Sequence, residues 1–244
     1  MKLTKPKQIY QFLGRCIVPM LGVSALSLLL IFAWMIFFSN STTVGTFDVY
    51  WIFYCHLAAS LMALLLFFAM AVFSCLTLVQ KESLFAASLA SAIAPSGCFI
   101  SVLSIGSGAI FGRSLWGTFW VWDLRITGLC LLFFMFFLVM TVGSQQSARQ
   151  RRSNDVRMAW TTIMSIILVP TAFVVFDFFL PLKHELNMSL VRSDGVDAYV
   201  MIGLSFVMVA SYSLAMIMSR TRTNILAREH RSVWTLDGAL EGSL

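Results

Sequence analysis

The sequence predicts an all-α membrane protein with six transmembrane helices. Hydrophobic residues make up 59% of its 244 residues and charged residues only 11%, whereas a soluble globule of this size needs more polar surface. Six stretches lack Asp, Glu, Lys and Arg, and each is long enough for the roughly 20 residues that cross the hydrocarbon layer as a helix. We expect one domain, residues 1–244, with spans at 16–38, 50–79, 84–110, 126–146, 158–180 and 198–219.

The basic residues predict how these spans are oriented. Thirteen of the 17 Lys and Arg residues lie in the amino terminus, the 80–83 connection, the loop around 149–157 and the polar tail 220–244. The positive-inside rule therefore places both termini in the cytoplasm. The net charge of +6 follows from this distribution and needs no nucleic-acid partner. The first uncharged run continues to Phe47 without an A-x-A site, so an uncleaved first span is favoured over a signal peptide.

The connections between spans add local detail. Residues 80–83 are so few that the second and third spans are expected to form a tight helical hairpin. The third span holds Pro95 and Gly97 and then further glycines toward its outer end. This pattern fits a kink with a flexible end, and it equally fits close helix packing on small residues. The fifth span is expected to end just before Pro181.

A tryptophan-rich segment, residues 113–127, follows the third span on the outer side. Tryptophan concentrates at membrane interfaces, so one interpretation is an interfacial belt. The other is a binding site, because indole rings offer a large apolar contact area to a flat ligand. The tryptophans are Trp116, Trp120 and Trp122, and the charged residues beside them are Arg113, Asp123 and Arg125.

Two of the three histidines are predicted to lie at the same outer level. His56 is 24 residues from Gln80, about 36 Å along a helix, and the hydrocarbon core is about 30 Å thick. His184 is 27 residues beyond Arg157, about 40 Å along a helix. His230 lies in the basic tail, where it is most simply a solvated residue.

Two imidazoles and a set of indoles at one membrane face suit haem. Haem iron accepts one neutral imidazole nitrogen on each side of the ring plane, so His56 and His184 are candidate axial ligands. Arg113 or Arg125 could pair with the propionates. The alternatives are interfacial histidines without a ligand, or zinc, for which two histidines without a carboxylate or thiolate cluster make a poor site. The five cysteines form no CxxC or CxxCH motif, which argues against thiol-disulfide chemistry and covalently attached haem.

The run Gly112 to Thr127, GRSLWGTFWVWDLRIT, resembles the tryptophan-rich "WWD" signature of haem-handling membrane proteins, roughly WGxxWxWDxRLT. Among the carriers of this signature, a short chain with six spans resembles the CcmC family, haem exporter protein C of cytochrome c biogenesis. Phe119 stands where many members have tryptophan, a change that keeps an aromatic face. By position, the family's two histidines fall on His56, within Tyr54-Cys55-His56, and on His184.

The resemblance implies a function at the outer face of the membrane. Such a protein presents haem b, held noncovalently, and passes it to the periplasmic haem chaperone CcmE, working with CcmA, CcmB and CcmD. Trp116, Phe119, Trp120 and Trp122 would contact the macrocycle, and Asp123 would organise the loop or meet the chaperone. The expected location is the bacterial inner membrane, in contact with lipid, with the mitochondrial inner membrane also compatible.

Two other functions compete with haem transfer. A haem lyase would attach haem to apocytochrome thiols, but it would need a docking surface that this chain lacks outside the membrane. A permease subunit for haem export would commonly need charged residues deep within a span, and none of the predicted spans has one. We therefore expect a transfer protein rather than an enzyme.

Overall fold

The computed structural model describes residues 6–38, 47–80, 84–121, 124–144, 151–179 and 196–229, and nearly all of these lie in helices, with no strand among them. The prediction of an all-α protein is confirmed. The six helices are α1 (Pro6–Phe38), α2 (Phe47–Val79), α3 (Leu84–Trp116), α4 (Leu124–Ser144), α5 (Arg151–Phe179) and α7 (Val196–Glu229).

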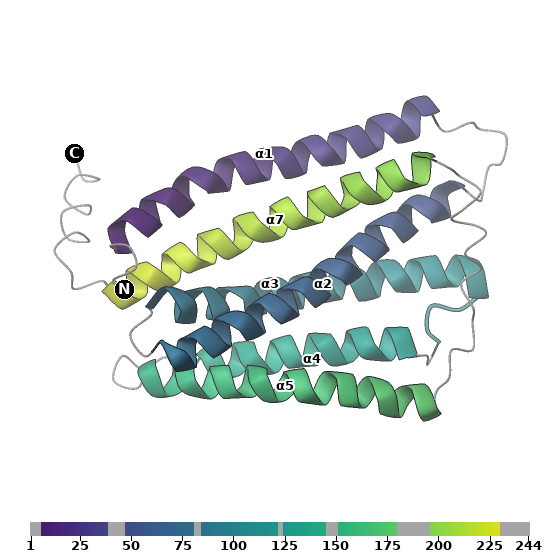
Figure 1. Ribbon diagram of the computed structural model, residues 1–244. Coiled ribbons are helices and arrows are strands. Elements are labelled where there is room, and N and C mark those ends of the chain that lie inside the picture. The colour runs from purple at the N-terminus through teal and green to yellow at the C-terminus, as the bar shows by residue number, and fades with distance from the viewer. Residues whose placement is uncertain are drawn as a thin grey trace.

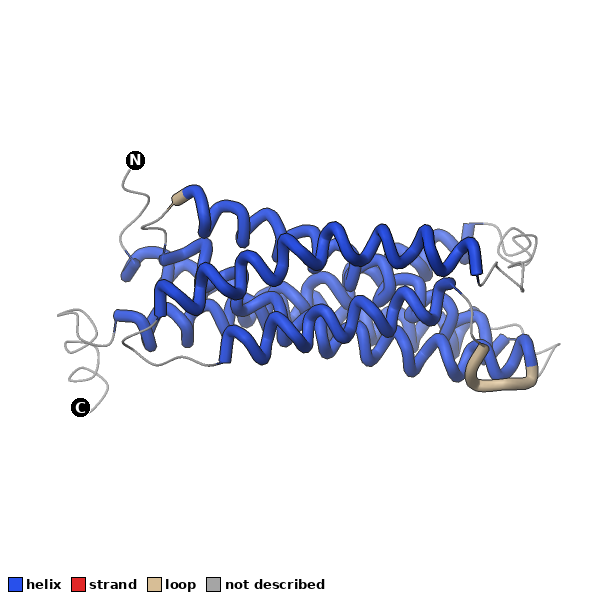
Figure 2. The backbone as a smooth tube through the Cα atoms, turned by 90° about the horizontal axis from the view of Figure 1, so that it is seen from below, coloured by secondary structure: helices blue, strands red, loops and turns tan. Residues whose placement is uncertain are grey.

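The helices lie side by side and run alternately up and down (Figure 1). The view from below shows the same elongated bundle (Figure 2). Helix α2 packs along α3, α1 packs along α7, and α4 lies between α3 and α5. The start of α1 and the end of α7 share one end of the bundle, called here the first end. The starts of α2, α4 and α7 share the opposite end, called here the second end.

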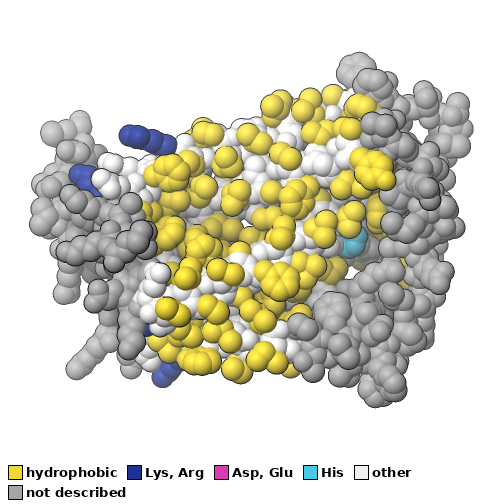
Figure 3. All heavy atoms as spheres, in the orientation of Figure 1, with side chains coloured by type: hydrophobic (Ala, Val, Ile, Leu, Met, Phe, Trp, Pro, Cys, Tyr) yellow, Lys and Arg dark blue, Asp and Glu magenta, His cyan; other side chains and the backbone are white. Residues whose placement is uncertain are grey.

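Five of the described helices, all except α5, are long and apolar enough to cross a membrane. The first turns of α5 contain the charged residues Arg152, Asp155 and Arg157. That α5 crosses the membrane stays a prediction, and so does the orientation of the termini. On the face drawn in Figure 3, hydrophobic side chains cover the middle of the bundle. The described Lys and Arg side chains visible there lie near the first end, a pattern in keeping with a bundle that spans a bilayer.

Small residues allow the central helices to approach closely. A Cβ atom on Gly97 of α3 would lie 2.3 Å from Cε1 of Phe136, whose ring is fully buried. The Phe136 ring also meets Phe67 of α2 edge-on, with 5.9 Å between centroids. Helices α2, α3 and α4 therefore meet where the Phe136 ring packs against Gly97. This contact is an example of close helix packing on small residues, one of the two interpretations of the third span.

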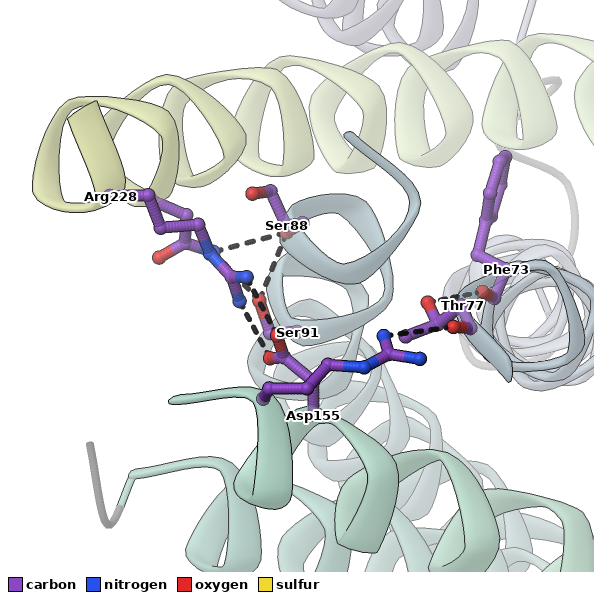
Figure 4. A network of polar contacts seen from close by, with 8 residues as sticks. Phe73, Thr77, Ser88, Ser91, Asp155 and Arg228 are labelled. Carbon is purple, nitrogen blue, oxygen red and sulfur yellow. Dashed lines mark hydrogen bonds and ion pairs between the residues drawn. The ribbon is translucent and has the colours of Figure 1, made fainter. Parts of the chain in front are cut away.

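A polar network holds the helices together at the first end (Figure 4). Arg228 of α7 donates two hydrogen bonds of 2.8 Å to the carboxylate of Asp155 on α5. Arg152 of α5 donates to the carbonyl oxygen of Thr77 on α2 at 3.0 Å. Asn224 donates to the carbonyl of Ser88 and the hydroxyl of Ser91, both on α3. Helix α7 thus continues past residue 219, and its last turns are packed against the bundle.

Candidate histidine site at the second end of the bundle

His56 is held by α3 near the second end of the bundle. It lies nine residues into α2, about 14 Å along the helix axis. Its Nδ1 is 2.9 Å from the carbonyl oxygen of Ser104 on α3. A carbonyl oxygen only accepts, so Nδ1 carries the proton and donates this hydrogen bond. In the neutral ring Nε2 then keeps its lone pair, which is the form in which imidazole binds a metal.

Gly108 provides the space for the imidazole. A Cβ atom at this position would lie 2.7 Å from Cε1 of His56 and 2.9 Å from its Nδ1, closer than such atoms can approach. The ring therefore lies directly against the backbone of α3. A glycine at this point is a steric requirement for the position of His56 as the structure has it.

Two serine hydroxyls support the same contact. Ser60 donates to the carbonyl oxygen of His56 at 2.8 Å, one turn along α2. Its oxygen also lies 2.6 Å from the hydroxyl of Ser104, which is fully buried. Because the single proton of Ser60 is already donated to His56, Ser104 is the donor between the two hydroxyls. These bonds fix α2 and α3 relative to each other where the imidazole crosses between them.

An apolar cluster that includes the neighbours of this histidine on α2 lies near the second end of the bundle. The rings of Phe53 and Phe111 are 4.9 Å apart at their centroids and tilted by 35°. Tyr54, Ile31 of α1 and Met201 of α7 complete its buried part. Side chains of four helices thus pack around the turns of α2 and α3 at the second end, so the backbone that carries His56 is held by this packing.

The tryptophan-rich segment begins where α3 ends. Gly117 has a φ of 72°, a conformation that suits glycine at a helix end, and its N–H donates to the carbonyl of Arg113 at 3.0 Å. The Arg113 guanidinium donates to the carbonyl of Gly117 and lies over the ring of Phe119, 5.2 Å from the centroid. The Thr118 hydroxyl donates to the carbonyl of Trp120. Arg113 therefore shapes this turn.

The side chains of two predicted site residues, His56 of α2 and Trp116 of α3, pack on one face of α3. The ring of His56 lies against Gly108, and the ring of Trp116 lies against Gly112, where a Cβ atom would be 3.1 Å from it. Gly108 and Gly112 are four residues apart, so they lie on the same helix face, one turn from each other. The structure thus brings an imidazole and an indole to neighbouring turns of the same surface.

Other predicted site residues are not described at the same depth. Trp122, Asp123 and His184 lie outside the described residues, and Arg125 is in α4 but its side chain is outside them. The described helix ends that flank residues 180–195, Phe179 and Val196, both lie at the second end of the bundle (Figure 1). The pairing of His184 with His56 stays a prediction.

Sequence reasoning missed Ser60 and Ser104 and gave Gly108 no particular partner. The available signal was the spacing of Ser104, Gly108 and Gly112 at intervals of four, which marks one narrow face of a helix. That spacing indicates close packing but does not say which side chain of which helix lies on it. Among the described residues no group of three or more His, Cys, Asp or Glu side chains is placed to hold a metal ion.

Comparison with known proteins adds a family to this geometry. The family model described as "Heme exporter protein C", CcmC, matches residues 1–236. The heme exporter protein C of Rhodobacter capsulatus is 25% identical over 230 residues, covering 93% of this chain and 94% of the relative. That of Paracoccus denitrificans is 27% identical, covering 74% and 78%. A putative ccmC-like mitochondrial protein for cytochrome c biosynthesis from Marchantia polymorpha is 40% identical over 87 residues, only 36% of this chain and 38% of the relative.

Proposed function

Because the chain belongs to the haem exporter protein C family of cytochrome c biogenesis, we propose that it holds haem at the outer membrane face and passes it to the chaperone CcmE. The family itself indicates transport or transfer rather than catalysis. The fold agrees with a multi-pass membrane protein. The bacterial inner membrane is the proposed location, with the first end of the bundle in the cytoplasm, and CcmA, CcmB and CcmD are the proposed partners.

The observation that carries the proposal is the hydrogen bond from His56 to Ser104. Since Nδ1 is committed to the carbonyl oxygen, Nε2 of the neutral ring is the nitrogen left for iron. A hydrogen bond from the second ring nitrogen to a carbonyl is the usual support of a metal-bound histidine, because it fixes both the tautomer and the ring direction. Gly108 beneath the ring and the serines Ser60 and Ser104 around its contact hold the imidazole in one orientation, which supports a role as a ligand.

The second axial ligand in this proposal is His184. It belongs to the segment between α5 and α7, whose flanking helix ends lie at the second end of the bundle with His56. Trp116 and Trp120, with Trp122, would cover the macrocycle, and Asp123 would organise the loop. Arg113 already donates to Gly117 and lies over Phe119, which favours Arg125 for a propionate.

Transfer to another protein fits noncovalent binding of haem b as cargo. No CxxCH motif is present to form thioether bonds, so release requires only exchange of the axial ligands and of apolar contacts. The chain's own residues then have three tasks, which are to coordinate the iron, to shield the ring from water and to place its edge at the membrane surface.

The test is the absorption spectrum of protein purified from haem-replete cells. Two axial imidazoles predict a low-spin reduced spectrum in the wild type, and a high-spin spectrum or loss of haem in both His56→Ala and His184→Ala. His230→Ala is the matched control, since it removes the third histidine, which is predicted to lie in the cytoplasmic tail, and it should retain the wild-type spectrum. An unchanged spectrum in His56→Ala would refute the assigned ligand.

A second measurement concerns the acceptor. When the haem-loaded protein is mixed with purified CcmE, haem absorbance should move to the chaperone fraction, and the histidine variants should transfer less. Haem appearing covalently on apocytochrome c with this chain as the sole added protein would instead indicate a haem lyase.

A further inference from the structure

A groove lies between α3 and α7, away from the histidine site. It has a volume of about 170 Å³. Phe99 and Ile100 line it on α3, and Tyr212, Met216 and Arg220 line it on α7. Ser96 and Ser213 also line it, and among the described lining residues Arg220 alone is charged, so the groove is mostly apolar with a cation at one place.

The cation stands at one end of the groove. Tyr212, Met216 and Arg220 follow one another at intervals of four, so they form a row along a single face of α7. From Arg220 to Tyr212 this row covers about 12 Å toward the middle of the bundle. At the inner end, the rings of Phe99 and Tyr212 approach to 5.9 Å between centroids. The groove therefore runs from a charge inward to an aromatic pair.

The depth of Arg220 matches the level of lipid phosphates. Helix α7 has 34 residues, about 51 Å, whereas the hydrocarbon core measures about 30 Å. If the excess is shared between both ends, about 10 Å of helix projects on each side. Arg220 lies nine residues before Glu229, about 14 Å from the helix end. Its flexible side chain can thus reach the headgroup region, while Tyr212 lies within the hydrocarbon layer.

Arg220 is exposed and, within the part of α7 and its neighbours that the structure describes, makes no hydrogen bond or ion pair. Arg228 on the same helix is instead bound to Asp155. The groove is open to the surface, and its volume of about 170 Å³ admits a stretch of one acyl chain. We propose that it binds an anionic phospholipid, with the phosphate on Arg220 and one acyl chain along Met216 toward Phe99 and Tyr212.

This inference needs no haem and is tested on the delipidated full-length protein by native mass spectrometry. Phosphatidylglycerol and phosphatidylcholine with identical acyl chains are titrated separately, and inorganic phosphate serves as a competitor. The wild-type protein should bind phosphatidylglycerol more tightly than phosphatidylcholine. Arg220→Gln should weaken that binding by about fivefold, the effect of one basic residue at a lipid surface, and leave phosphatidylcholine unchanged. Phe99→Ala removes a half-exposed ring and should weaken both lipids.

Arg15→Gln is the matched control. Arg15 is an exposed arginine on α1, nine residues from Pro6, and so lies about as far from its helix end as Arg220 does. The Arg15→Gln variant should bind both lipids with the affinity of the wild type. Equal weakening by Arg15→Gln, or equal binding of the two lipids by the wild type, would overturn the proposal. Displacement of the lipid by inorganic phosphate alone would also overturn it, because the site would then be one for a free anion.

Discussion

The Nδ1 atom of His56 on α2 lies 2.9 Å from the carbonyl oxygen of Ser104 on α3, and the same ring rests on Gly108 one turn further along α3. The two contacts are linked, since the Nδ1 atom that donates to the carbonyl is also one of the ring atoms that lie against the glycine. The position of the imidazole is thus decided by α3. A substitution on α3 can therefore move the His56 ring while residue 56 itself stays a histidine.

Gly108→Ala is expected to lower haem occupancy by about tenfold, the lower bound for loss of the outer contacts of a metal-binding histidine. The added Cβ would lie 2.7 Å from Cε1 of His56, so the ring must turn away and lose Ser104. The measurement is the ratio of haem to protein absorbance after purification. Gly106→Ala is the control, because a Cβ atom there meets nothing within 4 Å, and it should keep wild-type occupancy.

Ser60→Ala should have a smaller effect in the same direction. It removes the bond to the His56 carbonyl and leaves the Ser104 hydroxyl without that partner, but the bond between Nδ1 and the carbonyl of Ser104 remains. We expect a few-fold loss of haem affinity, measured by titration with haem and followed by absorbance. Ser107→Ala, which removes a second donor to the Ser104 carbonyl oxygen, is the comparison. A loss in Ser60→Ala as large as in His56→Ala would mean that the serine itself is the important group.

The helices could be predicted from the sequence, and so could some of their ends, such as Phe38, Val79 and Leu84, but other ends could not. Charge-free runs locate apolar helices because charges are costly in lipid, yet α3 continues beyond residue 110 through Arg113 to Trp116. It ends where Gly117 takes a positive φ, which is a local backbone event. Helix α7 likewise continues to Glu229 because Asn224 and Arg228 find partners on other helices. Hydropathy predicts which residues lie in the bilayer, but it does not predict the contacts between helices that extend a helix beyond it.

The position of His56 along its helix was predictable, but its contacts were not. The sequence places His56 far from Gln80 because that distance can be counted along one helix, and the structure has it near the start of α2, at the second end of the bundle. Its contact with Ser104 depends on how α2 and α3 are placed along each other, and this register is decided by packing across the whole pair. No local sequence pattern in α2 or α3 predicts the register between the two helices.

Gly97→Ala is expected to destabilise the folded protein by about 1–3 kcal/mol, the range for overpacking a close contact. The new Cβ would lie 2.3 Å from the ring of Phe136, which is fully buried and cannot move into free space. Thermal unfolding in detergent measures the change. Gly203→Ala in α7, where nothing lies within 4 Å, should be neutral or slightly stabilising. Adding Phe136→Leu to Gly97→Ala should recover part of the loss, and no recovery would argue against the contact.

Asp155→Asn should destabilise the first end of the bundle by about 3–5 kcal/mol, because it leaves Arg228 as an uncompensated buried charge. The side chains of Arg228 and Asp155 are only 5% and 12% exposed, so solvent screens the pair little. Asp155→Asn, Arg228→Gln and the double variant form a cycle, and the double variant should lose less than the sum of the singles. Arg157→Gln, at an exposed position of α5, is the control. Additive losses would show that the two residues act independently.

Phe119 offers a graded test of the tryptophan-rich segment. It lies under the guanidinium of Arg113 and is 57% exposed, so it contributes little to the core. Phe119→Trp should keep haem occupancy at the wild-type level or raise it, because indole is the better partner for a cation and offers a larger apolar face. Phe119→Ala should lower occupancy several-fold while the unfolding temperature stays unchanged, since the turn loses its ring but the helices keep their packing. Haem titration and thermal unfolding of the three proteins decide the point, and Phe119→Ala binding haem like the wild type would restrict the ligand surface to the tryptophans.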